Sequence, residues 1–176
     1  MKSELHPKQT GEDGKRAFES GQYLTAAELF RSAAQGYAAL NDAANAAEQK
    51  NNLSVTLLKL GRSQEALDAA LGTDAVFAGI HDVRRQGMAL NNQAAAFENL
   101  RRLDEALSAY ERSAALLAEA GEKEMRAVVL KAAAGLQLRR GKVAESGIRM
   151  IGVLEAREHP SVFERVLRYL VRLMQR

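Results

Sequence analysis

Apolar residues recur along the chain with the spacing of one face of an α-helix, and short polar clusters interrupt them at regular points. Between residues 43 and 60 the apolar positions follow an i, i+4, i+5, i+7 pattern. Gly61 then breaks the pattern, as glycine does at a helix C-terminus. Ser63 is the expected N-cap of a second helix that continues to residue 80. The apolar faces comprise Leu53, Leu57, Leu58 and Leu60 in the first helix and Ala66, Leu67, Ala70, Leu71, Phe77 and Ile80 in the second.

This two-helix pattern repeats every 40 residues without gaps, in aligned segments that begin at Gly21, Gly61, Arg101 and Gly141. One column of the alignment is always small, so we expect paired helices to cross closely there. Because a single unit cannot bury its apolar face alone, the units should stack into a solenoid. The small column is Ala26, Ala66, Ala106 and Ser146, and the column four positions later is Phe30, Ala70, Tyr110 and Met150.

Each unit ends at a residue type that is found at positive φ, namely Asn41, His81 or Gly121. The next residue is acidic in all three cases and can start the following helix favourably against its dipole. Residues 1–6 should form a flexible tail. The pattern predicts helices over residues 7–20, 23–40, 43–60, 63–80, 83–100, 103–120, 123–140, 143–158 and 160–175.

The composition favours helix and removes several kinds of chemistry. Alanine supplies 32 of the 176 residues, and alanine loses no side-chain entropy on helix formation. Cysteine is absent, which excludes disulfides, thiolate metal sites and a cysteine nucleophile. No run approaches the roughly 18 apolar residues that span a bilayer, and no signal-peptide pattern is visible in the polar first 14 residues. We therefore expect a cytoplasmic protein with no transmembrane segment.

Charge is unevenly distributed along the chain. Residues 1–122 carry a net charge of −4 and residues 123–176 carry +7, which gives +3 overall. A basic end can attract nucleic acid, an anionic surface or an acidic protein. The alternative is a solvated, arginine-rich surface without a partner.

No residue pattern typical of catalysis or of cofactor binding is present. The histidines His6, His81 and His159 are not at metal-ligand spacing, and there is no cysteine to assist them. The segment from Gly135 to Val143 has the wrong glycine spacing for a P-loop and lacks a Ser or Thr after its lysine. We expect a protein that is not an enzyme and holds no cofactor and no metal.

The repeated columns resemble the tetratricopeptide repeat (TPR), in which a turn glycine precedes a small residue and then an aromatic one. The family's usual period is 34 residues. A 40-residue unit is similar to the long-helix repeats of kinesin light chains, whose Leu-Asn-Asn-Leu-Ala string resembles the segments around Asn51 and Asn91. Arg101, in place of the turn glycine, departs from the pattern. The matching residues are Gly21, Tyr23, Ala26 and Phe30, then Gly61, Glu65 and Ala66, then Glu105, Ala106 and Tyr110.

The resemblance covers residues 8–158 and implies an all-α, right-handed superhelical solenoid of four helix-turn-helix repeats plus a C-terminal capping helix. The fourth repeat matches least well. The capping helix also has a broad apolar side, so a homodimer contact or a docked partner helix is the alternative to a simple cap. The expected repeats are residues 7–42, 43–82, 83–122 and 123–159, and the capping helix is 160–176.

The resemblance further implies that the first helix of each pair lines a concave groove. Asparagine is a poor helix former, yet Asn-Asn pairs occupy the same positions in two repeats. In the family such amides bond the backbone of an extended peptide, which implies this role for Asn52 and Asn92. The alternative is that the amides bond helix backbones between units or are merely solvated. Other groove candidates at repeat-related positions are Asn51, Lys59, Asn91, Asn99, Lys131 and Arg139.

The expected function is therefore a non-catalytic protein–protein interaction module that binds a peptide or partner protein in this groove. Two alternatives stay open. One is binding of nucleic acid or an anionic surface through the basic C-terminal third, although nucleic acid is not the expected partner. The other is a secretion-type chaperone.

Overall fold

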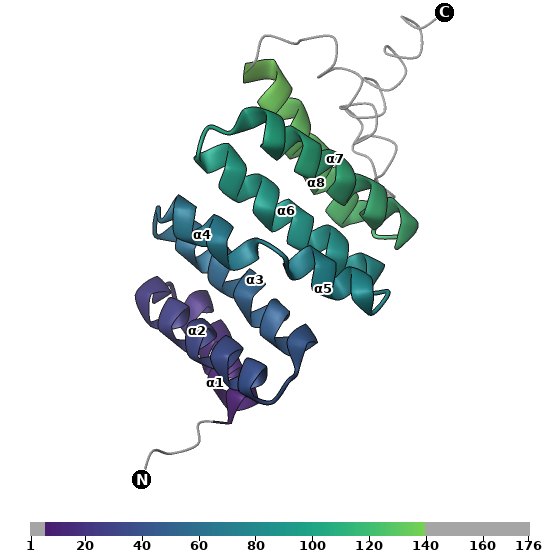
Figure 1. Ribbon diagram of the computed structural model, residues 1–176. Helices are drawn as coiled ribbons and strands as arrows, with labels where there is room; N and C mark the ends of the chain where they lie inside the picture. Colours follow the sequence, from purple (N-terminus) through teal and green to yellow (C-terminus); the bar gives the residue numbers. More distant parts are fainter. Residues whose placement is uncertain (1–5, 140–176) are drawn as a thin grey trace, which may run out of the picture.

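The computed structural model describes residues 6–139, and every regular element within that range is an α-helix (Figure 1). The all-α prediction is confirmed. The predicted helices 143–158 and 160–175 lie outside the described residues. The helices are α1 (Pro7–Glu19), α2 (Tyr23–Ala39), α3 (Ala43–Lys59), α4 (Ser63–Ala70), α5 (Thr73–Gly79), α6 (Val83–Asn99), α7 (Leu103–Glu119) and α8 (Lys123–Arg139).

The helices stack in chain order as antiparallel neighbours, which gives the predicted solenoid (Figure 1). Helix α2 packs on α1 and α3, the pair α4 and α5 packs on α3 and α6, and α7 packs on α6 and α8. The first helices of the successive pairs are thus α1, α3, α6 and α8. The second helices are α2, the interrupted pair α4–α5, and α7.

Small residues allow the helices of each pair to approach closely, as the alignment predicted. Ala26, Ala66 and Ala106 are all 0% exposed. In the column four positions later, the described members Phe30, Ala70 and Tyr110 are buried as well, and the two large ones, Phe30 and Tyr110, fill the space within their units. Buried clusters also cross from one pair to the next, because one cluster joins residues of α1, α2, α3, α4 and α6 and another joins residues of α6, α7 and α8.

Residues with positive φ recur every 20 positions, and the helices end at them. Within residues 6–139, a residue with positive φ lies at each turn within a unit and at each junction between units, as the repeat pattern predicted. The acidic residues after two junctions cap the next helix: Asp42 accepts a hydrogen bond from the backbone N–H of Asn45, and Asp82 accepts one from that of Arg85. The positive-φ residues are Gly21, Asn41, Gly61, His81, Arg101 and Gly121, and Gly72 adds a seventh.

The predicted helix 63–80 is wrong in one respect, because the chain leaves the helix at Leu71 and Gly72. Gly72 has a φ of 79°, and Leu71 is 50% exposed instead of lying on the buried face. The Thr73 hydroxyl shares its proton between the Ala70 carbonyl (2.7 Å) and the Asn51 amide oxygen (3.0 Å). Gln93 Nε2 donates to the same carbonyl at 3.1 Å and to Asp74 at 2.7 Å. Polar groups from two other helices therefore hold this break.

The predicted N-cap of α4 is also wrong. Ser63 is the first helical residue, and Arg62 occupies the cap position without a side-chain cap hydrogen bond. Arg62 instead pairs with Glu65 in the first turn of α4, with its Nε 2.6 Å from a carboxylate oxygen. The repeat-related Arg102 pairs with Glu105 in the same way, so an ion pair takes the place of a cap at both turns.

Candidate binding groove

Three hollows follow one side of the stack, between the first helices of successive units. They measure about 140 Å³ between α1 and α3, about 280 Å³ between α3 and α6, and about 510 Å³ between α6 and α8. Asn52 and Val55 line both the first and the second, so these two adjoin. The linings are Lys15, Phe18, Glu19, Phe30, Asn52 and Val55; then Glu48, Asn51, Asn52, Val55, Phe77, Arg84, Arg85, Met88 and Asn92; then Glu98, Val128, Lys131, Ala132, Gly135 and Arg139.

Asn52 and Asn92 face the second hollow from opposite sides, one from α3 and the other from α6. Both side chains are half-buried. Among the described residues neither amide has a hydrogen-bond partner. An amide offers one acceptor and two donors. The second hollow thus contains two unused polar groups beside the apolar side chains of Val55 and Met88.

Asn51 lies next to Asn52 but has a different environment. It is 9% exposed, and its amide oxygen accepts the hydrogen bond from Thr73 at the α4–α5 break. Its repeat-related residue Asn91 is half-buried and lines none of the three hollows. The two members of each Asn-Asn pair therefore differ in what they can offer a ligand.

Lys131 and Arg139 both lie in the third hollow, on the exposed face of α8. Arg139 is paired with Glu98 of α6, and Glu98 also accepts a hydrogen bond from the Tyr110 hydroxyl at 2.8 Å. Burial, and then the neighbouring Glu98 carboxylate, raises the pKa of Tyr110, so this hydroxyl stays a donor. The Arg139 charge is thus shared with the protein itself, whereas the Lys131 ammonium is exposed.

Lys59 and Asn99 do not line any of the three hollows. Asn99 is exposed near the turn between α3 and α4, where its amide donates to the Ala95 carbonyl of its own helix at 2.9 Å. Lys59 is exposed at the end of α3. The structure therefore brings Asn52, Asn92, Lys131 and Arg139 to the groove side and leaves these two at its edge.

Known proteins match this chain in structure but not in sequence. No family model and no curated protein matches the sequence. Among solved structures, the chain is similar to BtubC (BKLC) from P. vanneervenii, with a TM-score of 0.78 and 16% identity over 88% of this chain and 66% of that one. It is also similar to a putative kinesin light chain with nearly identical TPR-like repeats from Podosopora anserina, with a TM-score of 0.74 and 18% identity over 99% and 97% of the two chains.

The chain has the fold of a TPR-like repeat protein. A variant of the same Podosopora anserina protein matches with a TM-score of 0.73 and 19% identity, over 88% of this chain and 76% of that one. The expected fold family is thus confirmed. At these identities the similarity concerns the fold alone. The chain spans just under two thirds of the BtubC chain.

Two arginines of this TPR-like groove were not predicted from the sequence. The Arg85 guanidinium lies 4.9 Å from the centre of the Phe77 ring and pairs with Asp82 at 2.6 Å and with Glu48 at 3.5 Å. Arg84 pairs with Glu122 at 2.5 Å. Both arginines lie in the first turn of α6, where the helix dipole disfavours a cation. Two arginines at an unfavourable helix position were therefore the sequence feature that could have marked them as paired residues.

Residues 6–139 contain no group of three or more His, Asp or Glu side chains that could hold a metal ion. Over the same range no helix is long and apolar enough to cross a membrane. What the groove offers is a row of amides, apolar side chains and paired charges, which is suited to binding.

Proposed function

We propose that the chain is a non-catalytic interaction module that binds an extended peptide of a partner protein in the groove between its first helices. One observation carries the proposal: Asn52 and Asn92 face a common hollow without partners among the described residues. Asparagine amides can pair with both the N–H and the C=O of a peptide backbone. Recognition of this kind depends little on the peptide's side chains.

The spacing of the two amides suits an extended chain. Packed helices lie about 8–10 Å apart, and an extended peptide advances roughly 3.3 Å per residue. Asn52 and Asn92 would therefore meet backbone groups about three residues apart. The apolar side chains of Val55 and Met88 in the same hollow supply contact area for one peptide side chain. A cytoplasmic location for this interaction remains a prediction.

The test is selection of a random 12-residue peptide library displayed on phage against the full-length chain. Peptides that the wild-type chain selects should bind about 5–100-fold more weakly to the Asn52→Ala/Asn92→Ala variant, because each lost hydrogen bond costs roughly 0.5–1.5 kcal/mol. Asn99→Ala is the matched control, since that amide bonds its own helix outside the groove. Equal binding by all three proteins would contradict the proposal.

A further inference from the structure

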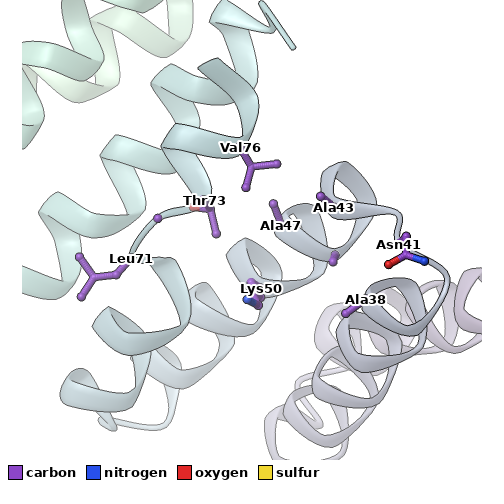
Figure 2. Close-up of a pocket in the computed structure, with 10 residues that line it drawn as sticks. Ala38, Asn41, Ala43, Ala47, Lys50, Leu71, Thr73 and Val76 are labelled. Carbon is purple, nitrogen blue, oxygen red and sulfur yellow. The ribbon is translucent and has the colours of Figure 1, made fainter. Parts of the chain in front are cut away.

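A fourth hollow, which we call the notch, lies on another side of α3, where α4 ends and α5 begins (Figure 2). Its volume of about 470 Å³ lies within the roughly 300–1,000 Å³ of typical ligand pockets. Its α3 residues 43, 46, 47 and 50 share one helical face, whereas residues 48, 51, 52 and 55 face the groove. The lining comprises Ala38, Asn41, Ala43, Ala46, Ala47, Lys50, Leu71, Gly72, Thr73 and Val76.

The notch has an apolar floor and an exposed rim. Ala46, Ala47 and Thr73 are buried, and Val76 approaches Ala47 from the opposite side (Figure 2). Lys50 and Leu71 at the rim are exposed. The α4–α5 break forms one wall, and the hydrogen bonds of Thr73 and Gln93 that hold the break also hold that wall in place. The notch is therefore a built feature of the fold.

At the next interface along the stack, the corresponding space is filled. Forty residues after Lys50, Leu90 is 0% exposed, and 40 residues after Ala47, Gly87 leaves room for Leu117. A Cβ on Gly87 would lie 3.0 Å from a Leu117 side-chain carbon, so that interface is tightly filled. Thr10 and Leu90, which lie 40 residues before and after Lys50 in the repeat, are both buried, whereas Lys50 is an exposed charge.

We propose that the notch binds an acidic peptide segment of a partner protein, with a large apolar side chain on the alanine floor and a carboxylate paired with Lys50. Lys50 is the one charged residue among the ten that line the notch. The small side chains of Ala46 and Ala47 leave the space that a leucine or phenylalanine of the partner fills. The chain's own residues 140–176 carry a net charge of +4. Lys50 has no ion-pair partner within residues 6–139, so its charge disfavours that basic segment as the occupant of the notch.

The experiment uses fluorescein-labelled nine-residue peptides with one central Leu or Phe between Asp and Glu residues, and matched peptides with Lys in place of the acids. Binding to the full-length chain is followed by fluorescence anisotropy. The acidic peptides should bind, and Lys50→Glu should weaken them about tenfold, because it replaces an attraction with a repulsion. Ala43→Phe, which fills the notch from its exposed rim, should weaken them to a similar extent. The Lys-containing peptides should not bind.

Two control variants distinguish binding in the notch from general attraction to the charge of α3 and from binding in the groove. Lys59→Glu makes the same charge change at an exposed position on the same helix, outside every hollow described above. It should leave binding within twofold of wild type, as should the groove variant Asn52→Ala/Asn92→Ala. The proposal is overturned if the acidic peptides do not bind the wild-type chain. It is equally overturned if Lys59→Glu or the groove variant weakens binding of the acidic peptides as much as Lys50→Glu does. It is also overturned if the free chain is a dimer that Lys50→Glu converts to a monomer, since a second copy of the chain would then occupy the notch.

Discussion

Single residues at positive φ decide where the helices of this protein end. Three of the positions at helix junctions lack glycine, and of these Arg101 departs furthest from the residue types that tolerate the left-handed region. Its φ is 62°, in a turn where the repeat-related residues Gly21 and Gly61 also have positive φ. A residue with a Cβ is strained there by about 1–2 kcal/mol.

Arg101→Gly should therefore stabilise the protein by about 1 kcal/mol, because glycine adopts positive φ without steric strain. The Arg101 side chain is exposed, so little packing is lost. Urea unfolding should show a higher midpoint with an unchanged slope. Arg102→Gly is the control, since Arg102 stacks 4.6 Å from the centre of the Phe97 ring and pairs with Glu105. That variant should lose stability, and a loss for Arg101→Gly as well would contradict the strain argument.

Adjacent asparagines on α3 should respond in opposite ways to the same substitution. Asn51→Ala removes an acceptor of the buried Thr73 hydroxyl and should cost about 1 kcal/mol of unfolding free energy. Asn52→Ala removes an amide that has no partner among the described residues, so it should be neutral or slightly stabilising through helix propensity. Thermal melting of the two variants measures both effects. If Asn52→Ala cost more than Asn51→Ala, the assigned roles would be reversed.

At the scale of helices, the sequence predicts where most helices begin and end but misses the break between α4 and α5. The column of small residues and the 20-residue spacing of the turns were sufficient to place both ends of α1, α2, α3, α6 and α7 within about one residue of where they are observed. The break was missed because Leu71 continues the apolar pattern of α4. Gly72 followed by Thr73 and Asp74 was the available signal, since glycine ends helices and Thr or Asp often begins them.

Gly72→Ala should destabilise the protein by about 1–2 kcal/mol, because the break requires a φ of 79° at this position. Gly79→Ala is a matched control on the same interrupted segment. Its φ is not positive, and an added Cβ there would meet nothing within 4 Å. This control should be neutral or gain up to about 1 kcal/mol from the lower flexibility of the unfolded chain. Chemical denaturation separates the two outcomes, and equal effects would show that the break does not depend on Gly72.

For the whole molecule, apolar stacking and not charge pairing holds the units together. Ion pairs link α3 to α6 through Glu48 and Arg85, and α6 to α8 through Glu98 and Arg139. These side chains are partly exposed, and such pairs contribute only about 0–1 kcal/mol each. Their role at the groove is to neutralise the arginines. Of the predicted groove residues, Lys59, Asn91 and Asn99 do not line the hollows. These ion pairs were not predicted, because they join residues 37 and 41 positions apart on different helices.

This neutralisation leads to a prediction that separates the proposed function from nucleic-acid binding. A peptide held by Asn52 and Asn92 meets uncharged amides, so raising NaCl from about 50 to 200 mM should change its affinity by less than about threefold. A ligand held through phosphates behaves differently, because its affinity falls steeply as bound counterions are released, by roughly 10³-fold or more over the same range for 6–10 contacts. Anisotropy titrations of a groove-selected peptide and of a labelled 20-residue oligothymidylate, on the full-length chain, measure both slopes. Two results together would assign the function to the basic C-terminal third instead of the groove. The oligonucleotide would bind tightly and with strong salt dependence, and Asn52→Ala/Asn92→Ala would leave the peptide affinity unchanged.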